Sequence, residues 1–200
     1  MHKTLKKDEY GVKSMLKIGI VQLTSGPNPK KNLKLILEKI EEACNLGVEL
    51  IVTPEVINFM APKNIVKSYS LYKESHDPTL KAIKEIAKKK NVWVLIGSLA
   101  LTNEKFINKS SSALFANRSI FINNFGRVIA RYDKIHLFDV NLKESGPFKE
   151  SDQYISGNKS VVVKTPFSDI GMTICYDLRF PYLFKSLSKN GAKIIFVPSA

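Results

Sequence analysis

The chain has 200 residues, of which 44% are hydrophobic, and it carries a formal net charge of +13 at pH 7. This length and apolar content suit one globular domain, and no apolar run approaches the roughly 20 residues that a membrane-spanning helix needs. The positive charge is almost entirely lysine, whereas arginine, which contacts phosphates and guanine bases best, is rare. We therefore expect no nucleic-acid partner and no membrane segment.

The cysteines and the N-terminus indicate a reducing compartment. Cys44 and Cys175 lie far apart in the sequence and lack the spacing of a zinc site or a disulfide framework, so both are expected to be reduced thiols. The basic start of the chain has no apolar core and contains acidic residues, unlike a secretory signal or a typical transit peptide. We expect residues 1–14 to be an extension before one domain, residues 15–200, of a cytoplasmic protein, with the mitochondrion as the alternative location.

The first third of the chain alternates strand and helix patterns. Residues 17–23 (KIGIVQL) are dense in apolar and β-branched residues and predict a strand covered on both faces. Apolar residues then recur at helical spacing over 33–44, and Gly47 stands where a helix end favours positive φ. The next predicted strand, VELIVT at 48–53, leads directly to Glu55.

The middle of the chain predicts one more helix followed by extended structure. Asp77 has the position of an N-cap and the proline after it that of the first helical residue. Residues 92–98 (VWVLIGS) predict a strand, and RSIFI and RVIARY flank NNFG, which is typical of a β-hairpin that turns at Gly126. Residues 139–160 are expected to form a loop.

The last third returns to alternation. VVVK at 161–164 and GMTIC at 171–175 predict strands, PYLFKSLSKNG at 181–191 predicts a helix, and KIIFVPS at 193–199 predicts a final strand. This order indicates an α/β layered fold with one mixed sheet or two sheets. Ligands in such folds bind beyond the carboxyl ends of strands, and that is where Glu55, Lys134 and Cys175 are expected.

These three side chains would supply complementary roles in attack on a carbonyl carbon. Because an ordinary thiol is only a few per cent ionised at neutral pH, a nearby ammonium and the helix beginning near Phe180 would favour the thiolate, or Glu55 would remove the proton as general base. Lys134 and the backbone N–H of Tyr176 would stabilise the oxyanion. A thioester would then form on Cys175 as ammonia leaves, and water would release the carboxylic acid.

Structural explanations also exist for these and other polar residues. Considered singly, Cys175 is a packed thiol, Glu55 a helix cap and Lys134 a solvated surface cation. We interpret His136 as a packing residue beside the site rather than as a base. Asn117 is expected to form a turn before the hairpin and to have no catalytic role.

The segments around the three residues resemble a known family. PEV at Glu55, YDKIHLFDV at Lys134 and CYDLRFP at Cys175 resemble the three signatures of the nitrilase (carbon–nitrogen hydrolase) superfamily, and the resemblance runs from about residue 17 to residue 200. It implies a Glu–Lys–Cys triad of base, oxyanion stabiliser and nucleophile, without cofactor or metal. GPFKES resembles the Nit branch of the family, in which a second glutamate, here Glu150, orients the substrate and the lysine.

The resemblance also implies a fold and an assembly. Members of the superfamily form a four-layer α-β-β-α sandwich and usually continue past the equivalent of Ala200, so the C-terminal part of the domain is expected to be missing here. They commonly pair, which implies a homodimer for the full domain. The segment between Asn103 and Asn117 is longer than expected for the branch.

The favoured function is a cysteine-dependent amidase that hydrolyses a small carboxamide to a carboxylic acid and ammonia. Within the Nit branch, Gly146 with Pro147 and the sequence DLRFP favour deaminated glutathione amidase over an omega-amidase acting on 2-oxo acid monoamides. A hydrolase of carbamoyl amines or nitriles is a further alternative in the same family. The alternative from another class is a truncated, inactive member that acts as an interaction protein.

Overall fold

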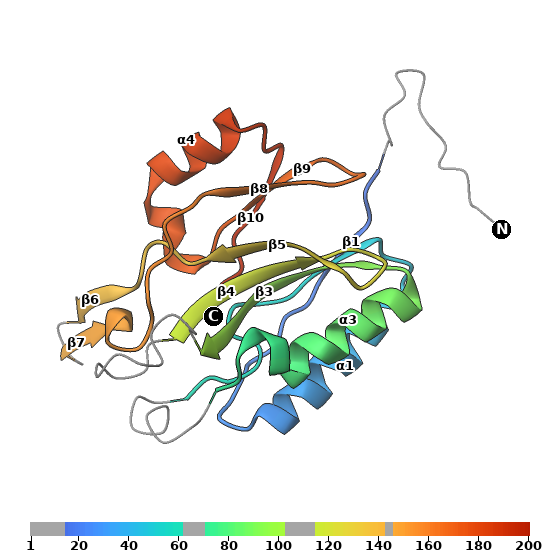
Figure 1. Ribbon diagram of the computed structural model, residues 1–200, viewed down its shortest axis with the longest axis horizontal. Coiled ribbons are helices and arrows are strands. Elements are labelled where there is room, and N and C mark those ends of the chain that lie inside the picture. The colour runs from blue at the N-terminus through green and yellow to red at the C-terminus, as the bar shows by residue number, and fades with distance from the viewer. Residues whose placement is uncertain (1–14, 62–70, 103–114, 143–145) are drawn as a thin grey trace.

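A computed structural model of the chain describes residues 15–61, 71–102, 115–142 and 146–200 (Figure 1). The expected extension at 1–14, and all but the end of the expected insertion between Asn103 and Asn117, lie outside these residues. Within the described residues, no helix combines the length and the apolarity needed to cross a membrane.

The larger sheet has five strands in the order β1-β2-β3-β4-β5, and its first three strands are parallel. Its members are β1 (Ile18–Ile20), β2 (Leu50–Val52), β3 (Trp93–Thr102), β4 (Phe115–Ile122) and β5 (Val128–Asp133). The β4–β5 hairpin turns at Gly126, where φ is 73°, as the NNFG pattern predicts. Parallel pairing follows from the helices that connect β1 to β2 and β2 to β3.

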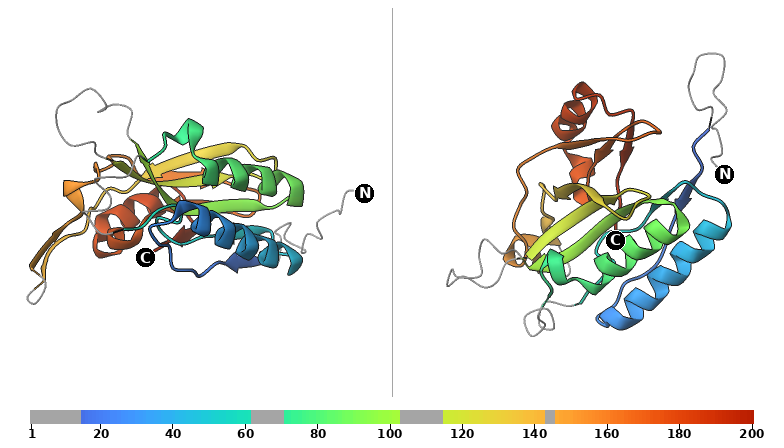
Figure 2. Two further views of the ribbon diagram at one scale, coloured as in Figure 1. Left: turned by 90° about the horizontal axis from the view of Figure 1, so that it is seen from below. Right: turned by 45° about the vertical axis from the view of Figure 1, so that its right-hand side comes forward.

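Helices α1 (Pro29–Asn45) and α3 (Pro78–Lys90) lie side by side on one face of this sheet (Figure 2). Each begins with a proline after a capping side chain: Asn28 accepts a hydrogen bond from the Lys31 N–H, and Asp77 accepts one from the Leu80 N–H. The short 3₁₀ helix η1 (Glu74–His76) precedes α3. The core under these helices contains Ile36, Ile40 and Ile83 from the helices and Ile51, Val94, Ile96, Ile120 and Ile122 from the sheet.

The smaller sheet has the order β10-β9-β8 and packs on the other face of the larger sheet. Its strands are β8 (Val161–Lys164), β9 (Asp169–Met172) and β10 (Ile194–Phe196), and α4 (Pro181–Lys189) lies beyond them. The shared core joins Leu50, Val52, Leu95, Phe121 and Tyr132 to Val163, Ile170, Met172, Leu183 and Leu187. The layers are therefore α-β-β-α, which confirms the expected fold (Figure 1).

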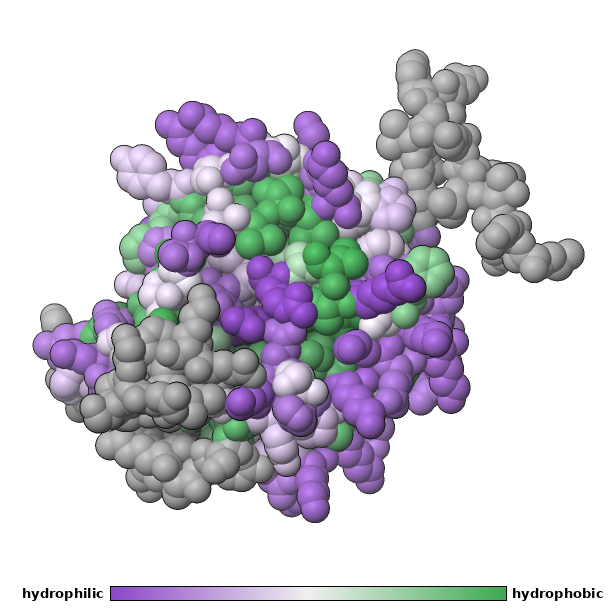
Figure 3. All heavy atoms as spheres, in the orientation of Figure 1, coloured by the Kyte–Doolittle hydropathy of each residue, from purple (hydrophilic) through white to green (hydrophobic). Residues whose placement is uncertain are grey.

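The expectation of a loop over 139–160 is wrong for its first part. Strands β6 (Asp139–Leu142) and β7 (Gly146–Lys149) form a two-stranded antiparallel ribbon, and the 3₁₀ helix η3 (Glu150–Asp152) follows. The ribbon projects from the layers (Figure 2) and most of the β7 residues are exposed, so no buried alternation marks it in the sequence. Figure 3 shows one face of the molecule, on which polar and charged side chains lie around an apolar area.

The loop that carries Glu55 is pressed against β3 at Gly97. A β-bulge between Ile96 and Leu99 brings β3 so close that a Cβ on Gly97 would lie 2.1 Å from the Thr53 carbonyl oxygen and 2.2 Å from that of Pro54. The Ser98 N–H donates to the Pro54 carbonyl and the Ser98 hydroxyl accepts from the Val56 N–H. A glycine is therefore required at residue 97 to hold the Glu55 loop in place.

We expect Gly97→Ala to lower the free energy of unfolding by about 1–3 kcal/mol, because the new methyl group overlaps backbone atoms that cannot move independently. Urea unfolding followed by circular dichroism measures the change. Gly26→Ala is the matched control, since a Cβ there meets nothing within 4 Å, and it should stay within about 0.5 kcal/mol of wild type. Equal effects of both substitutions would contradict this description of the loop.

Candidate active site

The structure brings Glu55, Lys134, Glu150 and Cys175 to one cavity of about 600 Å³. Glu55 follows β2, Lys134 follows β5 directly, and Cys175 comes after β9. Glu150 enters from η3, at the base of the ribbon. The expectation that the strand ends converge therefore holds in space, with the strands drawn from both sheets.

The ammonium of Lys134 lies between two carboxylates. Its Nζ is 2.9 Å from Glu55 Oε1 and 3.0 Å from Glu150 Oε2. Lys134 is 2% exposed, Glu55 6% and Glu150 8%, so the whole group is withdrawn from water. Burial alone would lower the pKa of Lys134, but the two negative charges outweigh burial, and the pKa is raised above its ordinary value. The lysine is therefore a fixed cation at neutral pH.

Cys175 begins the 3₁₀ helix η4 (Cys175–Arg179) with a φ of 46°, a conformation that is uncommon for a residue with a side chain. Its N–H donates to the Pro198 carbonyl at 2.9 Å, which helps to hold the turn. The side chain is half-buried and lines the cavity beside Glu55 and Lys134. Strained backbone of this kind is concentrated at functional sites.

The protonation of Cys175 differs from one expectation drawn from the sequence. Burial raises the pKa of the thiol above its ordinary value, the Glu55 carboxylate raises it further, and the Lys134 ammonium opposes them without prevailing. The ammonium and the helix end therefore do not produce a resting thiolate. The alternative expectation, that Glu55 takes the proton as general base, fits this environment because Glu55 interacts with the thiol.

Asp177 ties the cysteine turn to the segment of Lys134. Its buried carboxylate accepts hydrogen bonds from the Tyr132 hydroxyl at 2.6 Å, the Ile174 N–H at 2.9 Å and the His136 N–H at 3.1 Å. The His136 ring also lies 2.7 Å from it and stacks on Phe180. His136 is thus a packing residue beside the site, as expected.

Asn117 is not a turn-former, and the expectation that it forms a turn before the hairpin is wrong. It lies within β4, is 1% exposed and faces the cavity. Its Nδ2 lies 2.9 Å from Glu55 Oε1 and 3.1 Å from Glu150 Oε1. The sequence carries a weak signal for this placement, because residues 117, 119 and 121 share one face of a strand whose Phe121 is in the core between the sheets.

The rest of the cavity wall contains five aromatic side chains. It includes Phe59, Phe138, Phe148, Tyr154 and Tyr176, and the cation of Arg179 also lines it. Burial and then the charges of Glu150 and Glu55 raise the pKa of Tyr154, so its phenol stays a hydrogen-bond donor at neutral pH. The sequence offers no signal that would identify Tyr154 as a residue of the site. In the described residues, no group of His, Cys, Asp and Glu side chains is arranged to hold a metal ion.

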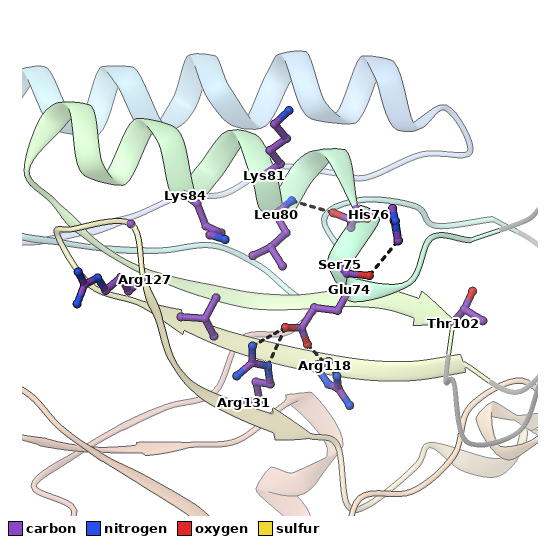
Figure 4. A pocket seen from close by; sticks show the side chains of 13 residues that line it. Glu74, Ser75, His76, Leu80, Lys81, Lys84, Thr102, Arg118, Arg127 and Arg131 are labelled. Carbon is purple, nitrogen blue, oxygen red and sulfur yellow. Dashed lines mark hydrogen bonds and ion pairs between the residues drawn. The ribbon is translucent and has the colours of Figure 1, made fainter.

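A larger hollow of about 1080 Å³ lies beside α3 and the β4–β5 hairpin (Figure 4). Glu74 crosses it and pairs with Arg118 at 2.8 Å and Arg131 at 2.7 Å, and Arg118 also pairs with Asp133. Its lining contains no cysteine. Since the larger hollow has ion pairs but no thiol beside a base, the smaller cavity is the candidate active site.

The sequence matches the family described as carbon-nitrogen hydrolase over residues 17–200. It is 39% identical over 186 residues to a deaminated glutathione amidase of Yersinia enterocolitica, covering 92% of this chain and 62% of that protein. It is 33% identical over 184 residues to the deaminated glutathione amidase of Mus musculus, covering 92% of this chain and 56% of that protein. The chain thus spans less than two thirds of the length of these relatives.

Solved structures show the same fold. The NitFhit protein of C. elegans superimposes with a TM-score of 0.78 at 28% identity, covering 93% of this chain and 45% of that chain. Saccharomyces cerevisiae Nit3, a member of the nitrilase superfamily, superimposes with a TM-score of 0.77 at 27% identity, covering 92% of this chain and 64% of that chain.

Glu55→Gln should move the ionisation of Cys175 to lower pH, because it removes the negative charge that helps to raise the pKa of this thiol. The rate of alkylation by iodoacetamide, resolved by peptide mass spectrometry, reports thiolate formation as the pH rises. Cys44 is the internal control, because its surroundings are Glu41 and Lys90 and its profile should not move. An unchanged or upward shift at Cys175 would contradict the described electrostatics.

We expect Asp177→Asn to lower the free energy of unfolding by about 2–4 kcal/mol, because a buried acceptor of several hydrogen bonds loses its charge. Tyr132→Phe removes only one of those bonds and should cost about 1–2 kcal/mol. Urea unfolding measures both values. If Asp177→Asn cost no more than Tyr132→Phe, Asp177 would not be the residue that joins the two segments.

Proposed function

The chain belongs to the carbon–nitrogen hydrolase family, and we propose that it is a cysteine-dependent amidase that acts through a thioester on Cys175. The observation that carries the proposal is a half-buried, protonated thiol beside a carboxylate, Glu55, that is itself fixed by a buried ammonium. This arrangement suits attack on an amide carbonyl, since base, nucleophile and cation surround one small cavity.

In the first step, Glu55 takes the thiol proton as Cys175 Sγ bonds to the carbonyl carbon. The C=O π electrons move to oxygen, and the Lys134 ammonium and the Tyr176 backbone N–H stabilise the oxyanion. The resting thiol makes this coupling necessary, because a raised thiol pKa leaves little thiolate to attack without a base.

In the second step, the oxyanion collapses and the C–N bond breaks. Protonated Glu55 gives its proton to the leaving nitrogen, which departs as a neutral amine, and the acyl group stays on sulfur as a thioester. Glu55, again ionised, then deprotonates a water molecule that attacks the thioester. The carboxylic acid leaves and the proton returns to Cys175 Sγ.

Glu150 orients Lys134 in this scheme. It lies 3.3 Å and 3.0 Å from the ammonium through its two oxygens, and its Oε2 also accepts the Phe138 N–H at 2.7 Å. The anchored carboxylate therefore fixes the position of the lysine ammonium. We propose that Glu150 also contributes to orienting the substrate amide.

We propose deaminated glutathione as the substrate, because relatives at 33–39% identity carry the name deaminated glutathione amidase. The aromatic wall and the Arg179 cation fit a substrate with both apolar and anionic parts. The amide nitrogens of deaminated glutathione carry substituents, so its hydrolysis releases an amine. The ammonia expected from the sequence would leave only from a primary amide. For the complete protein we further propose a homodimer in the cytoplasm that binds no nucleic acid.

Cys175→Ala should abolish turnover of deaminated glutathione while the protein stays folded, because the substitution removes the attacking sulfur and only a small part of the core. Chromatographic measurement of the released amine detects turnover, and circular dichroism detects folding. Cys44→Ala is the matched control and should retain activity, since Cys44 belongs to α1, packs against the core beneath that helix and does not line the cavity.

Turnover that persists in Cys175→Ala would contradict the mechanism. A folded wild-type chain with no turnover and no alkylation at Cys175 would favour the interaction-protein alternative instead.

A further inference from the structure

We propose that Asn117 is a positioning residue whose side-chain amide holds the carboxylates of Glu55 and Glu150 side by side, so that Glu55 faces the Cys175 thiol as its base. The inference rests on the function proposed above and deepens it, because it names what keeps the base in its working state. It concerns a residue that touches neither the sulfur nor, in the scheme above, the reacting carbonyl.

The geometry is a closed bridge of two donors and two acceptors. Lys134 Nζ lies 2.9 Å from Glu55 Oε1 and 3.3 Å from Glu150 Oε1. Asn117 Nδ2 lies 2.9 Å and 3.1 Å from the same two oxygens. The two carboxylates are therefore joined twice, once through the Lys134 ammonium and once through the neutral Asn117 amide. A carboxylate that rotated would lose hydrogen bonds to both of these donors.

The orientation of the amide follows from its neighbours. An NH₂ group has two hydrogens, and here each faces one carboxylate oxygen. The other atom of the amide, Asn117 Oδ1, is buried and has no hydrogen-bond partner among the described residues. Rotating the amide would turn that oxygen toward two anions, which is worse than leaving it unpaired. The unpaired oxygen thus marks an amide that is committed to the carboxylates.

The charge of the site explains why the carboxylates of Glu55 and Glu150 need the Asn117 amide as a donor in addition to the Lys134 ammonium. Two carboxylates share one ammonium in a site that is almost closed to water, which leaves an excess of negative charge. Close carboxylates in such a site tend to bind a proton between them, and a proton on Glu55 would remove the base. The donor hydrogens of Asn117 oppose such a shared proton, because each of them already faces one of the two carboxylate oxygens.

Other charged and titratable groups face these carboxylates from several elements. They are Lys134 after β5, Tyr154 after η3, and Cys175 and Arg179 of η4. Of these, only Lys134 hydrogen-bonds to both carboxylates in the described residues. Asn117 also fixes the lysine itself, because its backbone carbonyl accepts the Lys134 N–H at 2.9 Å. One residue of β4 thus positions the base, the second carboxylate and the cation.

The test uses the full chain with Asn117→Leu, which removes the donor at similar volume, and Asn117→Asp, which keeps the shape and replaces the donor with a third carboxylate. A carboxylate that loses a donor takes up a proton at higher pH. We expect kcat/KM for the amide to fall at least 100-fold, on the scale of general-base catalysis. The acidic limb of the pH profile should also move upward in both variants.

Ser119→Ala is the matched control. Ser119 lies two residues along β4 on the same face, is buried, and donates to the Ile96 carbonyl at 3.0 Å without contacting either carboxylate. Its loss should leave the acidic limb in place. If the limb also stayed in place in Asn117→Leu and Asn117→Asp, with activity lost only as folding is lost, Asn117 would be merely structural and the proposal would be overturned.

Alkylation of Cys175 by iodoacetamide separates this inference from the proposed function. It reports thiolate formation, and Asn117→Asp adds a negative charge beside Glu55, so the alkylation profile of Cys175 should move to higher pH in this variant even if the chain hydrolyses no amide. An upward shift together with absent turnover would support the role of Asn117 and count against the amidase. An unmoved limb in a chain that does hydrolyse the amide would overturn the role of Asn117 and leave the amidase standing.

Discussion

The burial of the Lys134 ammonium is the constraint on which the site depends. A cation that is 2% exposed is stable only with anions at bonding distance, and Glu55 and Glu150 provide them at 2.9 Å and 3.0 Å. These residues come from the ends of β2 and β5 and from η3, so the requirement to neutralise one charge draws separate segments together. The same contacts place a base and a cation beside the Cys175 thiol.

Close backbone contacts make this charge arrangement rigid. Gly97 lets β3 press on the Glu55 loop, and Gly157 does the same for Lys134: its N–H donates to the Lys134 carbonyl at 2.8 Å, and a Cβ there would lie 2.1 Å from the Asp133 carbonyl oxygen. Three non-glycine residues of the described part adopt positive φ, and two of them, Val56 and Cys175, lie next to or at a proposed catalytic position. The fold thus holds unfavourable local geometry where the chemistry needs a fixed direction.

The sequence predicts the layers well because buried strands and amphipathic helices leave apolar patterns, as over 48–53 and 33–44. It also places Glu55, Lys134 and Cys175 at strand ends. It does not reveal the exposed β6–β7 ribbon, which buries no pattern, or the contacts of Asn117, whose partners Glu55 and Glu150 are 62 and 33 residues away. The raised pKa of Cys175 was equally inaccessible, since burial decides it and composition does not.

We propose that Cys175 attacks an amide carbon and carries the acyl group, while Glu55 accepts the thiol proton and later returns it. Acid quenching of the chain during turnover of deaminated glutathione, followed by peptide mass spectrometry, tests this claim most directly, with hydroxylamine added in parallel to capture acyl groups. We expect a hydroxylamine-sensitive acyl group on the Cys175 peptide and formation of the matching hydroxamate. Turnover with the acyl group on another residue, or with no acyl group captured at all, would contradict it.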